Sequence, residues 1–296
     1  MKLKYGVIGL SLGNGQPFSW SIACNGYSKK NINKIPFKRV RDYLPKYELN
    51  LCKIDGAEVT HVWTQDKQKS KLIAKICNIK NISKSIADLA SSVDAILFLR
   101  DDIEKREKYL NKLIKTGKPI LVDKFLHFDP KKVKKFLKNQ KYDGQLFSES
   151  PLIHSKKIIL NQKEKYEIGK IKLINASVSG SWTQYAIHII QPVLNLIKNK
   201  KIISMSSTKT LNSTTVTLKW SDDLITVFST IENSNFIPFT EIIGSKSKLR
   251  INWELDYVFD DFITTLKSFT NRVQNKKFIN LDNQHLLISR IINAGR

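Results

Sequence analysis

The first half of the chain alternates between short apolar runs and segments whose apolar residues recur at helical spacing. In the segment 66–78, for example, Leu72, Ile73 and Ile76 fall on one stripe. Strands that alternate with helices in this way predict a parallel, doubly wound sheet of the Rossmann type. The expected strands are 4–10, 57–64, 93–99 and 118–124, and the expected helices are 19–27, 66–78, 102–117 and 129–140.

After residue 145 the pattern changes to alternating, β-rich segments between turns of Asn, Ser, Asp and Gly. Such alternation is typical of antiparallel strands with one buried face. We therefore predict a Rossmann domain at 1–145 and an α+β domain with a mostly antiparallel open sheet at 146–296. The closing helix, 283–294, is a candidate for packing back on the first domain. The expected strands lie within 170–182, 203–221, 224–233 and 240–253, and the expected helices are 184–198, 257–273 and 283–294.

Composition places the chain among globular proteins. With 296 residues, 41% of them hydrophobic and 26% charged, it can bury a sizeable core. Its three cysteines share no CxxC spacing, which disfavours a disulfide framework or a zinc site and favours a reducing compartment. No cluster has metal-ligand spacing, so we expect no metal. Because the apolar start leads quickly into Gly, Asn and Gln, and no apolar run reaches membrane length, we expect a cytoplasmic protein without a membrane segment.

The net charge of +24 favours anionic partners. Most of the basic residues are lysines spread over the whole chain, however, which favours a solvated surface. The most basic stretch, 28–46, belongs to an insertion at about 28–56, where Phe37, Tyr43 and Tyr47 stand among the charges. This stretch is open to three interpretations: a flap over a cleft, a surface excursion or, least favoured, a nucleic-acid patch.

The first expected strand runs into a glycine-rich turn, GLSLGNGQ. A dinucleotide-binding turn reads G-x-G-x-x-G, so that backbone amides can approach a pyrophosphate. Gly9 fits this pattern, whereas Ser11 and Asn14 stand at the other two glycine positions. The alternative is a flexible loop. The candidate cofactor contacts in this turn are Gly9, Ser11, Leu12 and Gly13.

In a dinucleotide site, an acid at the end of the second strand binds the ribose hydroxyls. Here Thr64 holds that position and Asp66 follows two residues later. A hydroxyl beside Lys67 and Lys69 tolerates a 2′-phosphate, which tilts the expected cofactor from NAD slightly toward NADP. The alternative for Asp66 is a cap on the next helix.

Residues 117–126, GKPILVDKFL, resemble the Gly-Lys-x-Val-x-x-Glu-Lys-Pro segment of the glucose–fructose oxidoreductase, inositol dehydrogenase and rhizopine-catabolism family (Gfo/Idh/MocA). Other segments resemble the family in the same order along nearly the whole chain: VIGL, SVDAILFLRDD, EKYEIGKIKLINAS, YAIHIIQPVLNLI, EIIGSKSKLRI and LLISRIINAGR. The resemblance implies an NAD(P)-dependent oxidoreductase that transfers a hydride at a hydroxyl or carbonyl carbon of a sugar, polyol or sugar-derived substrate.

The resemblance also implies that Lys124 lies between nicotinamide and substrate. An ammonium there stabilises the alkoxide character that develops on the substrate oxygen. Asp123, a further cofactor candidate, keeps the charge of the family's Glu, whereas Phe125 replaces a rigid Pro. The alternative is an ordinary lysine after a strand. Leu99 and Arg100, near the family's Thr-Pro position, are also cofactor candidates, and Arg100 is equally open to interpretation as a surface residue.

The family pattern Asp-x-x-x-His corresponds to Gln184 and His188, which the resemblance implies handle the proton and orient the substrate. An amide at 184 cannot stabilise an imidazolium by charge, so His188 is expected to be a weaker base, with Tyr185 as a substitute donor. A structural histidine is the alternative for His188. Three residues at the start of the second domain are candidates to line the cleft: Ser148, Ser150 and His154.

Two further expectations concern partners and activity. We expect a small sugar-like substrate and a homodimer or homotetramer formed through the C-terminal sheet. The second hypothesis is a binding or regulatory protein that kept the fold and lost the chemistry, as Gln184 and the irregular turn suggest. A nucleic-acid binder, which rests on charge alone, is the third.

Overall fold

The structure is a computed structural model that describes residues 2–46, 54–155, 160–197, 200–253 and 258–296. It contains two six-stranded sheets, one parallel and one mostly antiparallel, which confirms the predicted fold class. The chain divides into two compact units. The first consists of residues 1–127, 131–149 and 258–285, and the second of residues 128–130, 150–257 and 286–296.

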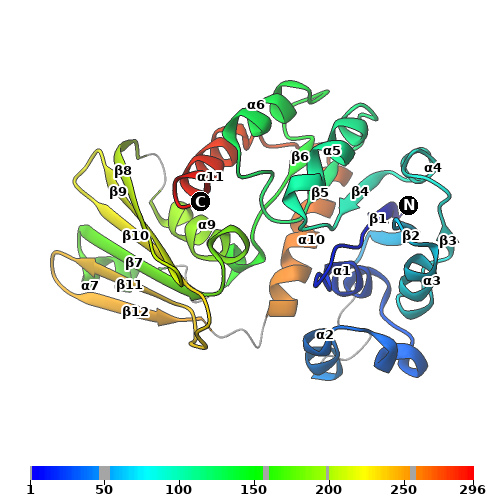
Figure 1. The fold of residues 1–296 in the computed structure, drawn as a ribbon, viewed down its shortest axis with the longest axis horizontal. Coiled ribbons are helices and arrows are strands. Elements are labelled where there is room, and N and C mark those ends of the chain that lie inside the picture. The colour runs from blue at the N-terminus through cyan, green and yellow to red at the C-terminus, as the bar shows by residue number, and fades with distance from the viewer. Residues whose placement is uncertain (1, 47–53, 156–159, 198–199, 254–257) are drawn as a thin grey trace. The chain divides into compact units, whose positions relative to one another are not determined.

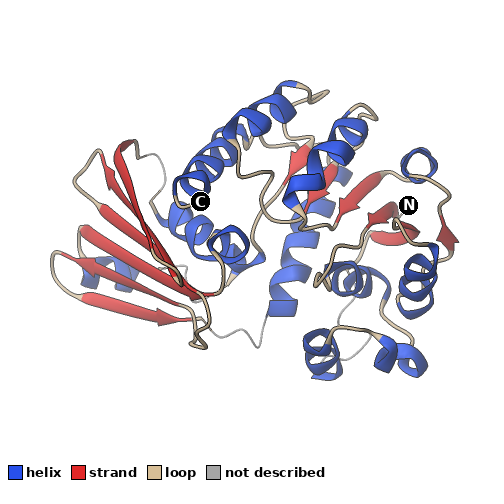
Figure 2. Ribbon diagram, viewed as in Figure 1, coloured by secondary structure: helices blue, strands red, loops and turns tan. Residues whose placement is uncertain are grey.

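The sheet of the first unit is parallel, with strand order β3-β2-β1-β4-β5-β6 (Figures 1 and 2). Its central strands β4 and β5 are buried along their whole length because helices cover both faces, and they therefore read as continuous apolar runs. Strands β3 and β6 have two residues each, too few to produce a sequence pattern. The strands are β1 (Leu3–Ile8), β2 (Ala57–Trp63), β3 (Asn81–Ile82), β4 (Ala95–Phe98), β5 (Ile120–Val122) and β6 (Leu146–Phe147).

Helices α1, α3 and α10 contribute to one core layer on this sheet, with Phe18, Ile73 and Leu266 among its buried residues. On the other face, α4 packs so closely that a Cβ on Gly6 of β1 would lie 2.3 Å from Leu89 Cδ2. The helices are α1 (Gln16–Asn25), α2 (Lys38–Tyr43), α3 (Lys67–Ile76), α4 (Ile86–Ser92), α5 (Arg106–Ile114), α6 (Pro130–Lys138), α10 (Val258–Gln274) and α11 (Asp282–Ala294), with short 3-10 turns η1 (Lys29–Lys34), η2 (Leu44–Lys46) and η3 (Ile103–Lys105).

Helix α10 belongs to the first unit although it follows the strands of the second in sequence. Phe269 contacts the rings of Tyr5 and Phe147, with centroid distances of 5.9 and 5.6 Å. The Tyr5 hydroxyl also lies 2.8 Å from Thr270 Oγ1. The sequence pattern predicted a helix here within the C-terminal domain. Apolar periodicity shows that a helix has a buried face, but not which sheet that face meets.

The described part of the basic insertion packs into the core of the first unit. The ring of Phe37 lies 6.0 Å from that of Phe18, and the ring of Tyr43 lies 5.4 Å from that of Phe259. Aromatic side chains that pack against the core in this way are less available for stacking on bases, which disfavours the nucleic-acid interpretation. Tyr47 lies outside the described residues.

The sheet of the second unit has strand order β12-β11-β7-β10-β9-β8, and only the β7–β10 pair is parallel. Val216, Leu218 and Phe228 alternate with less buried residues along β9 and β10, as the sequence pattern predicted. The strands are β7 (Ile171–Ser179), β8 (Ile202–Lys209), β9 (Ser213–Trp220), β10 (Ile225–Ile231), β11 (Phe239–Gly244) and β12 (Lys248–Asn252).

Helices α8 and α9 carry the candidate histidine region of the second unit. Ile189, Ile190 and Val193 of α9 are buried, whereas His188 on the same helix is half-buried. The Trp182 indole donates to the carbonyl of Ile292 at 2.8 Å and thereby ties α8 to the last helix. The helices are η4 (Pro151–His154), α7 (Gln162–Ile168), α8 (Trp182–Tyr185) and α9 (Ile187–Leu196).

None of the helices in the described residues combines the length and the apolar character that a membrane crossing requires. In the same residues, His, Cys, Asp and Glu side chains form no group of three or more suited to a metal ion. Cys24 and Cys77 are buried free thiols, and Cys52 lies outside the described residues.

Candidate functional site

The carboxyl ends of β1, β4 and β5 lie side by side at one edge of the parallel sheet. The strand order reverses its direction between β1 and β4, and open α/β sheets bind ligands outside the strand ends at such a switch point. The glycine-rich turn follows β1, Arg100 follows β4, and Asp123 and Lys124 follow β5. The topology therefore brings most of the cofactor candidates to one edge.

The turn after β1 presents backbone amides rather than side chains. A Cβ on Gly9 would lie 2.7 Å from Pro17 Cγ, so glycine is needed for the helix to follow the strand closely. Gly13 has a φ of +78° with no atom within 4 Å of its Cβ position, and Leu12 at the tip is fully exposed. In the described residues the amides of Leu12, Gly13 and Gly15 have no hydrogen-bond acceptor. Three amide donors in one turn without an acceptor in the described structure fit an anionic group such as a pyrophosphate.

The first turn of α1 offers fewer donors than a regular dinucleotide site. The amide of Gln16 already donates to Asn14 Oδ1 at 2.8 Å, and Pro17 has no amide hydrogen. The donors available for a phosphate therefore come from the turn itself and not from the start of the helix. This is the physical consequence of the irregular glycine spacing.

Asp123 joins the turn to Lys124. Its Oδ2 accepts from Asn14 Nδ2 at 2.9 Å, and its Oδ1 accepts from the Lys124 amide at 2.9 Å. The Lys124 ammonium lies 3.5 Å from the same Oδ1, with its side chain 15% exposed beside a carboxylate that is 2% exposed. A buried carboxylate that is paired and hydrogen-bonded holds its neighbours in a defined geometry. Lys124 is thus a positioned residue and not an ordinary surface lysine.

Ser11 makes a second link across the strand ends. Its hydroxyl donates to Asp101 Oδ1 and accepts from the Asp101 amide at 3.1 Å. Because Ser11 follows β1 and Asp101 follows β4, this pair links the segments that follow two neighbouring strands. Leu99, another cofactor candidate, is fully buried, and its amide donates to the carbonyl of Ile8 at 2.8 Å.

Arg100 is 4% exposed, so its interpretation as a surface residue is wrong. Its guanidinium forms a two-pronged pair with Asp102, at 2.9 and 2.5 Å, and donates to Gln65 Oε1 at 2.6 Å and to the carbonyl of Leu10 at 3.2 Å. It also lies 5.0 Å from the ring centroid of Tyr109. These contacts tie the ends of β1, β2 and β4 together and occupy the side chain that was a candidate for binding the cofactor directly.

A second buried arginine, Arg106 at the start of α5, holds the segment that follows Lys124. Its guanidinium is 1% exposed and donates to the carbonyls of Phe125, Leu126 and Arg100, the last two at 3.2 and 2.5 Å. Burial lowers the pKa of Arg106 to about 10, while the carboxylates of Asp123, Asp101 and Asp102 act in the opposite direction. In the described structure, this arginine fixes the backbone where the family's rigid proline is replaced by Phe125.

The end of β2 differs from the expected ribose contact. Thr64 is 4% exposed, and its hydroxyl interacts with the carbonyl of Asp66 at 2.5 Å and with Ser70 Oγ at 3.0 Å. The Asp66 carboxylate accepts from the amides of Gln68 and Lys69 and caps α3, which is the alternative that the sequence left open. The hydroxyl of Thr64 is therefore already engaged, whereas Asp66 keeps a partly exposed side chain.

In the second unit, His188 is half-buried on α9 and contacts Ser150. Its Nδ1 lies 2.8 Å from Ser150 Oγ, and the amide of Ser150 donates to Gln191 Oε1 at 2.6 Å. Ser150 and Gln191 are 0% and 1% exposed. His188 and Gln191 are three residues apart on one helix face, so Ser150 contacts both.

The two other candidates on this side lie at the surface. Gln184 is exposed, and its Oε1 lies 3.4 Å from Ser181 Oγ. The Tyr185 side chain is 40% exposed, and its ring centroid lies 6.4 Å from that of His188. Ser148 is buried in the first unit, and His154 is half-buried at the end of η4. Ser150, the third of these serine and histidine candidates, contacts His188.

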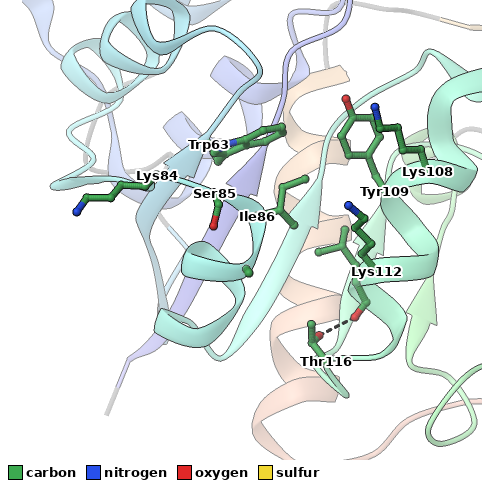
Figure 3. A pocket seen from close by; sticks show the side chains of 10 residues that line it. Trp63, Lys84, Ser85, Ile86, Lys108, Tyr109, Lys112 and Thr116 are labelled. Atoms are coloured by element: carbon green, nitrogen blue, oxygen red, sulfur yellow. Dashed lines mark hydrogen bonds between the residues drawn. The ribbon is translucent and has the colours of Figure 1, made fainter.

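A separate pocket of about 460 Å³ lies between α4 and α5 on the first unit (Figure 3). None of its lining residues is a candidate from the sequence. Figure 3 shows the Lys112 ammonium directed toward the space between Trp63 and Tyr109, and the Lys84 side chain directed away from it. The lining residues are Trp63, Lys84, Ser85, Ile86, Ala87, Lys108, Tyr109, Lys112, Leu113 and Thr116.

Sequence reasoning missed four residues of these networks: Asn14, Asp101, Arg106 and Gln191. Asn14 appeared only as a departure from the glycine pattern, and Arg106 stands among charged residues of an apparent surface helix. Asp101 directly follows Arg100. Because the position at a strand end marked Arg100 as a candidate, the same signal could have marked Asp101. Gln191 lies on the same predicted helix face as His188, which was the available signal for it.

No family model matches the chain, and no curated protein is similar to it. Solved structures with the same fold match it over nearly its whole length. Scyllo-inositol dehydrogenase from Lactobacillus casei, solved with NAD(H) and scyllo-inositol, is 14% identical, with 99% of this chain and 96% of that chain covered at a TM-score of 0.68. Myo-inositol 2-dehydrogenase from Lactobacillus plantarum is 14% identical, with 99% and 97% covered at a TM-score of 0.71. GenD2 from gentamicin A biosynthesis, solved with NAD, is 9% identical, with 99% and 93% covered at a TM-score of 0.76.

Proposed function

We propose that this chain is an NAD(P)-dependent oxidoreductase of the Gfo/Idh/MocA family that transfers a hydride at a hydroxyl or carbonyl carbon of a polyol or sugar-like substrate. The observation that carries the proposal is the link from Asn14 through Asp123 to Lys124, which joins a dinucleotide-type turn to a positioned lysine. The similarity of the fold to dehydrogenases solved with NAD supports it.

The bound cofactor would supply the hydride acceptor or donor. In the chain itself, the amides of Leu12, Gly13 and Gly15 would hold the pyrophosphate. The Lys124 ammonium would donate a hydrogen bond to the reacting oxygen and stabilise negative charge as it develops there. Asp123 keeps that ammonium oriented, and Arg106 and Arg100 keep the supporting backbone in place.

His188 would take up the proton of the substrate hydroxyl in oxidation and return it in reduction. Tyr185 and Gln184, both at the surface of the second unit, are proposed as substrate contacts and not as partners of the imidazole. Their exposure supports this assignment, since a side chain that binds substrate has to be reachable from solvent.

For the cofactor we propose NADP over NAD by a small margin. No carboxylate stands at Thr64, where one would repel a 2′-phosphate, and Lys67 and Lys69 are exposed nearby on α3. The expected result for a Lys67→Ala/Lys69→Ala variant is weaker binding of NADPH with little change for NADH. Lys71→Ala, an exposed lysine on the same helix, is the control.

We also propose a homodimer or homotetramer formed through the C-terminal sheet. Ile203, Ile225 and Ile231 on its strands are 63%, 40% and 38% exposed, and exposed apolar side chains on a sheet favour an interface. The mass of the protein in solution, measured with wild-type protein and an Ile203→Lys/Ile231→Lys variant, tests this proposal.

The exposure of Gln184 favours a second candidate function, a binding protein without turnover. The Gln184 side chain contacts Ser181 and not His188 in the described structure, and an amide at this position supplies no negative charge to the histidine. Tight nucleotide binding without any redox reaction would distinguish this candidate from the enzyme.

The test of the cofactor site is a titration with NADH and NADPH followed by nicotinamide fluorescence. Gly13→Ala should weaken binding about tenfold or more, because a Cβ at a positive φ disturbs the amide cradle. Gly117→Ala is the matched control: Gly117 also has a positive φ, +69°, and no atom within 4 Å, but it lies at the end of α5. Absence of binding of both nucleotides to the wild-type protein would overturn the proposed function.

A further inference from the structure

His188 contacts the buried residue Ser150, which is itself held by Gln191 of the same helix as His188. Ser150, immediately before η4, contacts the imidazole Nδ1 through its hydroxyl at 2.8 Å. The backbone of Ser150 is fixed in turn, because its amide donates to Gln191 Oε1 at 2.6 Å. Both Ser150 and Gln191 are almost completely buried, so this arrangement is part of the packed interior.

Gln184 does not take part in this arrangement. It lies on α8, whereas His188 lies on α9, and its side-chain oxygen is near Ser181 Oγ at 3.4 Å. The spacing of four residues therefore does not produce a contact between the two side chains. The hydroxyl that lies 2.8 Å from the histidine Nδ1 comes from Ser150, 38 residues earlier in the chain.

We infer that Ser150 is the positioning residue of His188, with Gln191 as its anchor, and that it performs the orienting role that position 184 has lost. The inference rests on the proposed function, because it assigns His188 to proton transfer. Ser150 does not touch the substrate in this account; it acts through the imidazole.

A hydroxyl can orient the ring in either neutral tautomer. A carboxylate only accepts a hydrogen bond, whereas a serine hydroxyl both donates and accepts. When the neutral ring carries its proton on Nδ1, it donates a hydrogen bond to Ser150 Oγ, and Nε2 can take the proton of a substrate hydroxyl as the substrate carbon gives up a hydride to the cofactor. In the reverse direction the doubly protonated ring keeps its Nδ1–H bond to Ser150 Oγ and gives the Nε2 proton to a substrate carbonyl oxygen as the carbon receives a hydride, which returns the same neutral tautomer. The same contact therefore supports both directions of the reaction.

The neutral partner also has a cost. Serine adds no negative charge next to the imidazolium, so this contact gives the protonated ring a hydrogen bond and not an ion pair. A Ser150→Asp substitution should consequently raise the pKa of His188, whereas Gln184→Asp, at the exposed position, should change it much less.

The test is nitrogen-15 NMR of the histidine rings as a function of pH. The chain has five histidines, and His188→Gln identifies the signal of His188. We expect Ser150→Ala to change the ratio of its two neutral tautomers about threefold or more, with a shift in its titration midpoint. Ser150→Thr, which keeps the hydroxyl, should restore the wild-type behaviour, and Gln184→Ala should leave it unchanged. The signals of the other four histidines report whether each variant is folded.

Two outcomes overturn the inference. One is a His188 tautomer ratio and midpoint that respond to Gln184→Ala and not to Ser150→Ala. The other, which needs no variant, is a wild-type His188 whose ring nitrogens show the shifts of a free imidazole. Failure of the proposed function gives a different result: neither NADH nor NADPH binds, whatever the histidine spectrum shows.

Discussion

The two candidate proton- and charge-handling side chains are held by opposite kinds of partner. Lys124, in the first unit, is held by the buried carboxylate of Asp123, and two buried arginines fix the surrounding backbone. His188, in the second unit, contacts the neutral hydroxyl of Ser150, whose backbone amide donates to Gln191 Oε1.

The difference matches the role that we propose for each side chain. An ammonium that stabilises a developing alkoxide has to be held in place, and a neighbouring carboxylate orients it. An imidazole that gives and takes a proton has to populate both forms near neutral pH. A neutral hydroxyl supports both, so the comparison teaches that the type of partner follows from the number of charge states the side chain uses.

The largest expected effect is the loss of activity on replacement of Lys124, the charged side chain that Asp123 holds. Lys124→Met should lower kcat/KM about a thousandfold, or about 4 kcal/mol, because the transition state loses its ammonium. Steady-state assays with scyllo-inositol and myo-inositol as test substrates measure this change. Lys115→Met, at an exposed position on the preceding helix end, is the control and should retain full activity.

Removing the backbone support should cost stability as well as activity. Arg106→Met leaves three carbonyl oxygens without their donor in a buried setting, and we expect the free energy of unfolding to fall by about 3 kcal/mol. Urea denaturation measures this value. An unchanged midpoint would show that the charged network does not hold the strand ends together.

A buried histidine of the first unit sharpens the contrast with His188. Burial lowers the pKa of His285 from 6.5 to about 4, with a smaller opposing contribution from the backbone of Leu146. Between these two values the unfolded chain binds a proton that the folded chain does not, so stability falls as the pH falls through this window, by about 2 kcal/mol from about pH 7 to about pH 5. Thermal unfolding across this range measures the slope.

His285→Gln should remove most of that slope. His61, whose pKa is also lowered by partial burial, is the matched control, and His61→Gln should change the slope less. A slope unaffected by His285→Gln would mean that another group controls acid stability.

The smallest expected effect is on the neutral side. Ser150→Ala removes one part-buried hydrogen bond made by a neutral hydroxyl, so the free energy of unfolding should fall by about 1 kcal/mol. Measured beside Arg106→Met in the same denaturation series, this variant tests the comparison directly. A Ser150→Ala loss as large as that of Arg106→Met would contradict the distinction between charged and neutral support.

The sequence predicted much of the fold for a local reason. The alternation of apolar runs and helical stripes in the first half determines a parallel sheet, and the Lys124 and His188 segments stand where a family pattern can be recognised. Helix α10 shows the limit, because its apolar stripe is clear but its packing on the first sheet depends on contacts with residues more than 100 positions away, such as Tyr5.

The supporting networks could not be predicted from the sequence for the same reason. Asn14 and Asp123 are 109 residues apart, and Ser150 and His188 are 38 apart, so no local pattern links them. Arg106 lies in a helix rich in charged residues, where burial of one guanidinium has no sequence signature. The irregular glycine turn was recognised as a departure, but which of its amides remain available depends on the side chain of Asn14.

The central claim is that this chain carries out redox chemistry on a hydroxyl or carbonyl carbon. The most direct test is to incubate the purified protein with NADP⁺ or NAD⁺ and a panel of inositols and sugars, and to follow the absorbance of reduced nicotinamide. The account predicts that reduced nicotinamide forms with at least one substrate and that Lys124→Met nearly abolishes its formation. Saturable nucleotide binding with no reduced nicotinamide formed from any of these substrates would contradict the account and favour the binding protein.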